Sequence, residues 1–337
     1  MAGVKRKITL SEILSIVTRP QTLSELYGQD KLVATLRNQM SKRPPQTFLF
    51  HGESGAGKTT IMRIMSKSFQ CTHFKVWGDP CKACQINTSF AIHDINASED
   101  RGVEEVAKIV ELSRFKPTNS PKRVIMLDEV HGLSASAWKL LLKPLEEPPA
   151  STIWILGSSK PNKIPIEAKR RCTSYQLKSL GITAVEDYLK KTAAANKITK
   201  PLDTLFEQLH LLQINTPGFV LQALEAFASG ATAVEAVAGL DESGVDSFRV
   251  AKAVTKGDWK GVIAELKTAS PDQARLIRAV VAGYLKGIMT RESNGSALDR
   301  AASSILDLCS PPPDDNMMMN WMWATLHKIT KRYQVQR

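Results

Sequence analysis

A glycine-rich turn between an apolar run and a helical pattern is the feature that most constrains this chain. Residues 47–60 read TFLFHGESGAGKTT, in which the apolar run Phe48-Leu49-Phe50 leads into the turn and a predicted helix from Thr59 to Phe69 follows it. Glycines let such a turn point its backbone N–H groups inward around phosphate oxygens, because a Cβ atom would block the approach. The spacing GxxxxGK[ST] between a strand and a helix therefore predicts a phosphate-binding loop.

The residue types in this loop suit ATP and Mg²⁺. We expect Lys58 to reach the β- and γ-phosphates and the hydroxyl of Thr59 to ligate Mg²⁺. The helix N-terminus behind the loop adds the positive end of its dipole. The alternative is an ordinary glycine turn that joins a strand to a helix. The predicted nucleotide-binding residues of the loop are Gly52, Glu53, Ser54, Gly55, Ala56, Gly57, Lys58, Thr59 and Thr60.

A second apolar run ends in two adjacent carboxylates, Asp128 and Glu129. Parallel sheets bind ligands at the carboxyl ends of their strands, which is where this run delivers both side chains. We expect Asp128 to hold Mg²⁺, directly or through water, and Glu129 to orient and deprotonate the attacking water. An apolar run followed by Asp-Glu is by itself a common solvated strand end. Its position downstream of a phosphate-binding loop favours the catalytic interpretation.

Two further side chains fit the same site. Ser159 ends the next predicted strand, where its hydroxyl would position the attacking water; the alternative is a serine in a turn. Arg171 ends a short helix ahead of the last predicted strand. An arginine there can project into the nucleotide site of a neighbouring subunit and stabilise the charge of the transition state. The alternative for Arg171 is ordinary surface charge.

The order of predicted elements divides the chain into three parts. Strands alternate with helices through residue 178, which predicts an α/β fold with a parallel sheet covered on both faces. Only helical patterns follow, and a run rich in Gly, Ala and Ser from Ser229 to Ser247 indicates a boundary between two helical parts. We therefore expect an α/β domain at 1–178 with an insertion at 71–84, a helical domain at 179–235 and a second, all-α domain at 236–337.

Composition bears on partners and location. The chain of 337 residues has a net charge of +12, which favours polyanionic partners, nucleic acid first, although it also serves solubility. The sequence has no apolar run long enough for a membrane span and no signal peptide. We expect a cytoplasmic protein with no membrane partner.

Three of the cysteines form a cluster with metal-ligand spacing. Cys71, Cys81 and Cys84 offer three soft ligands, two of them separated by two residues. Structural zinc prefers four ligands in a tetrahedron, and His73 or Asp79 would have to supply the fourth. The alternative is a reduced loop that holds no metal.

Taken together, these motifs resemble the clamp-loader ATPases of the AAA+ superfamily, in particular the gamma/tau type of bacterial DNA polymerase III and, more loosely, the small subunits of replication factor C. The resemblance covers about residues 18 to 180. Its motifs are Arg19-Pro-Gln-Thr with Gly28-Gln29, HGESGAGKTT, Asp94-Ile-Asn-Ala, Leu127-Asp-Glu-Val-His131, Leu145-Glu-Glu-Pro-Pro149 and Arg171-Cys172.

The resemblance implies a P-loop AAA+ parallel-sheet domain, a helical lid and an all-α collar that holds a ring-like assembly together. It implies that Arg19 packs beside adenine, that Arg171 acts in trans, and that the cysteine insertion is a zinc module. The partners implied are a sliding clamp, primer–template DNA and other clamp-loader subunits in a pentameric homo- or hetero-oligomer. ATP binding and hydrolysis would open the clamp and load it on DNA.

The chain departs from the family pattern at three positions. Arg170 stands where the family has serine before its trans-acting arginine, and Asn87 stands in place of a fourth cysteine. Leu221 stands where the family has a sensor arginine three residues after a glycine, here Gly218. Such divergence suits a phage-encoded version, acting in the cytoplasm of an infected host, or another fast-evolving replisome.

Two rival functions remain open at this point. One is another DNA-directed AAA+ motor, for branch migration or helicase loading, which needs no sliding clamp. The other is a clamp-loader subunit that supports assembly without hydrolysing ATP. Subunits of that second kind have degenerate phosphate loops, so the intact Lys58, Thr59, Asp128 and Glu129 argue against it.

Overall fold

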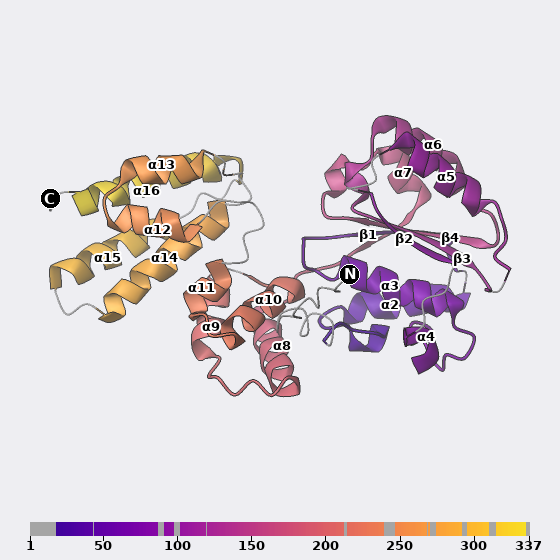
Figure 1. The fold of residues 1–337 in the computed structure, drawn as a ribbon, viewed down its shortest axis with the longest axis horizontal. Helices are drawn as coiled ribbons and strands as arrows, with labels where there is room; N and C mark the ends of the chain where they lie inside the picture. Colours follow the sequence, from indigo (N-terminus) through magenta and orange to yellow (C-terminus); the bar gives the residue numbers. More distant parts are fainter. Residues whose placement is uncertain are drawn as a thin grey trace, which may run out of the picture. The chain divides into compact units, whose positions relative to one another are not determined.

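The computed structural model describes residues 18–42, 44–86, 91–97, 102–118, 120–211, 214–238, 247–267, 269, 274–291, 295–309 and 315–334 (Figure 1). Asn87 lies outside the described residues. The described chain forms two compact units. One contains residues 18–184 and 216–218, and the other contains residues 185–215 and those after 218.

The first unit is built on a parallel sheet, as the sequence predicts. Its strands are β1 (Thr47–His51), β2 (Ile92–Asn96), β3 (Arg123–Asp128), β4 (Thr152–Ser158) and β5 (Thr173–Gln176). They are arranged in the order β2-β3-β4-β1-β5, and every neighbouring pair is parallel. The register pairs Asn96 with Asp128 and His51 with Ser158. The carboxyl ends of β1, β3 and β4 therefore meet at one edge.

Helices cover both faces of this sheet (Figure 1). One face carries α2 (Asp30–Lys42) and α3 (Lys58–Gln70), and the other carries α5 (Val103–Ser113), α6 (Ala135–Glu146) and α7 (Ile166–Arg171). The short α4 (Lys82–Ile86) belongs to the cysteine insertion. The 3₁₀ helices are η1 (Leu23–Glu25), η2 (Val130–Gly132) and η3 (Pro161–Lys163).

Alternation along the central strands explains why both faces are covered. Successive side chains of a strand point to opposite faces of the sheet. A strand that is apolar at every position must therefore be covered on both faces. Val124 and Met126 pack in the core beneath α2 and α3, whereas Ile125 and Leu127 pack in the core beneath α5 and α6. Trp154, which is 0% exposed, belongs to the second of these cores.

The second unit is entirely helical in its described residues. Its helices are α8 (Ile182–Ala195), α9 (Asp203–Leu211), α10 (Pro217–Ala228), α11 (Ala233–Ala238), α12 (Ser247–Thr255), α13 (Trp259–Leu266), α14 (Ala274–Arg291), α15 (Gly295–Leu308) and α16 (Asp315–Gln334), with the first residues of α8 and α10 assigned to the first unit. Each of the described helices is too short or too polar to cross a membrane.

One helix of this unit was not predicted. Within the run from Ser229 to Ser247, which the sequence marks as a boundary, residues 233–238 form helix α11, in which Val237 is 0% exposed. Its small residues, chiefly Ala, permit a helix as readily as a linker. The division of the helical residues into two domains near 235 stays a prediction.

Candidate site for nucleotide binding and hydrolysis

The glycine-rich turn connects β1 to α3 at the carboxyl edge of the sheet. Gly57 precedes α3 in the left-handed region, with φ of 96°, which a residue with a side chain rarely adopts. A Cβ on Gly52 would lie 2.6 Å from the carbonyl oxygen of Leu177, which follows β5. Both glycines are thus required by the path of the loop.

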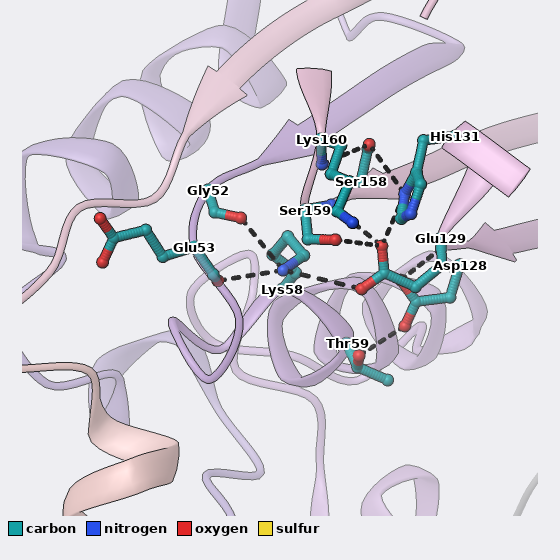
Figure 2. Close-up of polar contacts among 10 residues, drawn as sticks. All are labelled: Gly52, Glu53, Lys58, Thr59, Asp128, Glu129, His131, Ser158, Ser159 and Lys160. Atoms are coloured by element: carbon teal, nitrogen blue, oxygen red, sulfur yellow. Dashed lines mark hydrogen bonds and ion pairs between the residues drawn. The ribbon is translucent and has the colours of Figure 1, made fainter. Parts of the chain in front are cut away.

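Lys58 lies inside this turn rather than in solvent (Figure 2). Its side chain is 5% exposed, and its Nζ donates to the carbonyl oxygens of Gly52 at 3.1 Å and Glu53 at 3.0 Å. The Nζ also lies 4.0 Å from Oε1 of Glu129. Burial lowers the pKa of Lys58, and the nearby carboxylates of Glu129 and Asp128 oppose that shift.

Thr59 and Asp128 form the part of the site suited to Mg²⁺. The Thr59 hydroxyl donates to Oδ2 of Asp128, and Oδ1 of Asp128 accepts from the backbone N–H of Glu129 at 2.9 Å. One hydroxyl and one carboxylate side by side are hard oxygen ligands of the kind Mg²⁺ selects. The donor set therefore fits the cation that the sequence predicts here.

A glycine on the neighbouring strand makes room for Asp128. A Cβ built on Gly157 would lie 2.5 Å from Oδ1 of Asp128 and 2.6 Å from Sδ of Met62. Since real Cβ atoms do not approach other atoms so closely, any side chain at this position would displace the carboxylate. Sequence reasoning missed Gly157, because its role depends on the pairing of β3 with β4.

Glu129 is held by three donors in an uncommon backbone conformation. Its φ and ψ are 49° and 42°, in the left-handed region, where a non-glycine residue is strained. Its Oε2 accepts from the backbone N–H and the hydroxyl of Ser159, each at 2.9 Å, and lies 3.0 Å from Nδ1 of His131 (Figure 2). The predicted pair of Glu129 and Ser159 is thus brought into direct contact.

His131 is a site residue to which sequence reasoning gave no role. Its position two residues after Glu129 was visible, but only the turn of η2 brings its ring back to that carboxylate. The pKa of His131 is lowered chiefly by burial. Glu129 opposes this shift, while Lys160, Lys163 and Lys58 add to it. The lowered pKa favours the neutral form of the ring near pH 7.

Arg171 does not take part in this cluster. Its Nε and Nη2 both lie 2.9 Å from Oε2 of Glu146, and its Nη1 donates to the carbonyl oxygen of Glu167 at 2.9 Å. Within the described residues, the structure does not bring Arg171 to Lys58, Asp128 or Glu129. A role at the site of another subunit stays a prediction.

Arg19 lies near charged residues of α3. The pKa of Arg19 is lowered by burial and by Arg63, while Asp94 raises it. These neighbours place it near Arg63, the partner of Asp94 in an ion pair of 2.9 Å. Its packing against adenine stays a prediction.

The three clustered cysteines lie close together, as their spacing predicts. The sulfur atoms of Cys71, Cys81 and Cys84 all lie within 4.8 Å of one another, and the N–H of Cys81 donates to Sγ of Cys71 at 3.3 Å. Three soft thiols in one cluster fit the chemistry of zinc, but they leave a tetrahedron one ligand short.

Neither predicted fourth ligand joins this group. Asp79 pairs with Nη2 of Arg37 at 2.7 Å and accepts from Ser24, and Nδ1 of His73 lies 3.1 Å from the hydroxyl of Thr72. Zinc at this cluster therefore stays a proposal.

The chain is similar in sequence to known DNA polymerase III subunits. Residues 28–181 match the sequence family described as "DNA polymerase III, delta subunit". Over 189 residues the chain is 35% identical to DNA polymerase III subunit tau of Bacillus subtilis, a match that covers 54% of this chain and 33% of that protein. This part of the chain is related to the DNA polymerase III gamma/tau subunits. The predicted resemblance is confirmed.

A second relative sets the extent of the match. The chain is 30% identical over 186 residues to DNA polymerase III subunit tau of Escherichia coli, covering 53% of this chain and 29% of that protein. The matched part thus spans about a third of the length of these gamma/tau relatives.

A solved structure supports the fold. A RuvB variant from Thermotoga maritima aligns with a TM-score of 0.50 at 16% sequence identity, covering 80% of this chain and 91% of that one. At this identity the likeness concerns the fold alone. It agrees with the predicted α/β fold followed by helices.

Proposed function

We propose that this gamma/tau-related chain is an ATPase subunit of a sliding-clamp loader in DNA replication. The observation that carries the proposal is the arrangement around Glu129. Its carboxylate contacts Ser159 and His131. Lys58 and Asp128 are its neighbours. A purely structural subunit has no need of a carboxylate so placed next to a phosphate-binding loop.

Each residue has a role in hydrolysis. The N–H groups of the loop and Lys58 bind the phosphates of ATP, for which Lys58 exchanges its bonds to Gly52 and Glu53. Thr59 and Asp128 would hold Mg²⁺, which would supply positive charge against the phosphates of ATP. Glu129 accepts the proton of the attacking water and Ser159 fixes the orientation of that carboxylate.

The proposal extends to assembly. Arg171 of one subunit completes the site of the next, where a guanidinium stabilises charge on the transferred phosphoryl group. Residues 179–235 act as a lid and residues 236–337 as a collar in a pentameric loader, with other loader subunits as partners. ATP binding opens the clamp and engages primer–template DNA, whose phosphates the net charge of +12 attracts. The subunit works in the cytoplasm.

The cysteine cluster is proposed to hold structural zinc. Thiolates of Cys71, Cys81 and Cys84 supply three ligands. A water molecule supplies the fourth.

The test is steady-state ATP hydrolysis by the purified protein, alone and with primer–template DNA and the clamp from the same source. We expect strong stimulation that needs both DNA and clamp. Stimulation by DNA that ignores the clamp would instead indicate a branch-migration or helicase-loading motor. Absence of hydrolysis with every combination of clamp, DNA and co-purifying subunits would indicate a structural subunit.

A further inference from the structure

The guanidinium of Arg171 is bound on two sides by its own chain. Arg171 is the last residue of α7, and Glu146 is the last residue of α6, which packs beside α7. Nε and Nη2 of Arg171 share Oε2 of Glu146, and Nη1 donates to the carbonyl oxygen of Glu167, one turn back on α7. The side chain is thus folded back along its own helix.

These contacts occupy the edge that an anion from outside would need. Guanidinium groups bind phosphate most strongly through two parallel N–H donors, and the pair formed by Nε and Nη2 is one of the two such edges. Glu146 already takes both donors of this edge. Nη1, which belongs to the other edge, is engaged by Glu167. A phosphate can bind bidentately to the edge formed by Nε and Nη2 only after Glu146 releases it.

The ion pair is weak enough to be released. The side chain of Glu146 is 59% exposed and that of Arg171 is 27% exposed, so water and salt screen their attraction. Exposed pairs of this kind contribute little, and a multiply charged phosphate outcompetes a single carboxylate for a guanidinium.

We propose that Glu146 is a positioning residue that restrains Arg171, holding its guanidinium against α6 until the γ-phosphate of a neighbouring subunit displaces the carboxylate. This inference rests on the proposed function, because it assumes that Arg171 acts in trans. It makes activation by the neighbour depend on an exchange of partners, from Glu146 to phosphate, so that Arg171 is available only in an assembled, nucleotide-bound ring.

The first experiment probes the restraint on the isolated chain, without reference to hydrolysis. Phenylglyoxal reacts with accessible guanidinium groups, and the rate at Arg171 is followed by mass spectrometry of its peptide. We expect Glu146→Gln to raise this rate by up to about fivefold, the factor that corresponds to an exposed ion pair of about 1 kcal/mol. Glu147→Gln, which removes the same charge from the next residue, is the matched control and should leave the rate unchanged. An equal rate in all three proteins would overturn the inference.

The second experiment measures the trans effect in mixed assemblies. A donor carrying Lys58→Ala has no working site of its own but keeps Arg171, and an acceptor carrying Arg171→Ala keeps its site. Hydrolysis by the mixture, with clamp and DNA present, then reports Arg171 of the donor alone. We expect Glu146→Gln in the donor to raise kcat with KM for ATP unchanged, and the gain to shrink as salt weakens the pair in the unmodified donor.

The outcomes separate the two ideas. If the mixture hydrolyses no more ATP than the donor and the acceptor do separately, Arg171 does not act in trans. The proposed trans role of Arg171 and its restraint by Glu146 then both fail. If the mixture is active but Glu146→Gln in the donor leaves kcat unchanged or lowers it, the trans role stands and the restraint by Glu146 is wrong.

Discussion

Ser159 donates two hydrogen bonds to one oxygen of Glu129, one from its backbone N–H and one from its hydroxyl, each of 2.9 Å. These bonds join the ends of two neighbouring strands, since Glu129 follows β3 and Ser159 follows β4. They fix the direction of the carboxylate that we propose as the general base, in a residue whose backbone is strained.

Ser159→Ala should slow hydrolysis and leave ATP binding intact. The variant loses the hydroxyl donor but keeps the N–H donor, so the carboxylate loses part of its orientation. Hydrogen bonds to charged groups contribute about 1.5–3 kcal/mol, which predicts a decrease in kcat of roughly 10- to 100-fold. Ser159→Thr, which retains the hydroxyl, is the control. A kcat for Ser159→Ala equal to that of the unmodified protein would show that the hydroxyl has no such role.

Glu129→Gln should bind ATP normally and fail to turn it over. The amide keeps the size of the carboxylate but cannot accept a proton, and general bases contribute about 10²–10⁴-fold to such rates. Equilibrium binding of a fluorescent ATP analogue and steady-state hydrolysis measure the two effects separately. Near-normal turnover by this variant would contradict the assignment of Glu129 as the general base.

Gly157→Ala should weaken Mg²⁺-dependent nucleotide binding. The new methyl group would lie 2.5 Å from Oδ1 of Asp128, so the carboxylate must move away from Thr59. Gly181→Ala is a matched control, because a Cβ there meets nothing within 4 Å. Titration of ATP with and without Mg²⁺ gives the affinities. The explanation fails if both variants bind Mg-ATP equally well.

Stability should fall as the pH drops below the ordinary histidine pKa of about 6.5. Burial lowers the pKa of His51, His93 and His131, so the folded chain takes up their protons later than the unfolded chain does. The unfolded state therefore binds more protons between pH 6.5 and the lowered pKa values, and the free energy of unfolding decreases in that window.

Urea unfolding at a series of pH values measures this decrease. His131→Gln removes one of the three groups and should make the dependence on pH shallower. An unchanged slope in that variant would show that His131 does not contribute.

Cys84→Ser should lower the zinc content and the Tm of the protein. With one of three thiolates gone, the remaining two cannot hold the metal tightly, and binding free energy is lost from folding. Cys309→Ser, which changes an exposed cysteine outside the cluster, is the control. Elemental analysis and thermal unfolding of both proteins supply the comparison. The proposed zinc site would be contradicted if the unmodified protein contained no zinc.

The strands and the phosphate loop followed from local pattern. The apolar run before the phosphate loop is β1, and the apolar run that ends in Asp128 is β3. Fully apolar runs of this length leave little choice but a buried parallel strand. Helix α11 was missed, because small residues in a short run carry no period that distinguishes helix from linker.

By itself the sequence determined the α/β order, the loop from Gly52 to Thr60 and the carboxylates Asp128 and Glu129, because each depends on residues that are neighbours in the chain. Only the tertiary structure decided that Gly157 leaves space for Asp128, that His131 and Ser159 both meet Glu129, and that Glu146 binds Arg171. These relationships depend on strand register and helix packing, which bring together residues that no spacing along the chain relates.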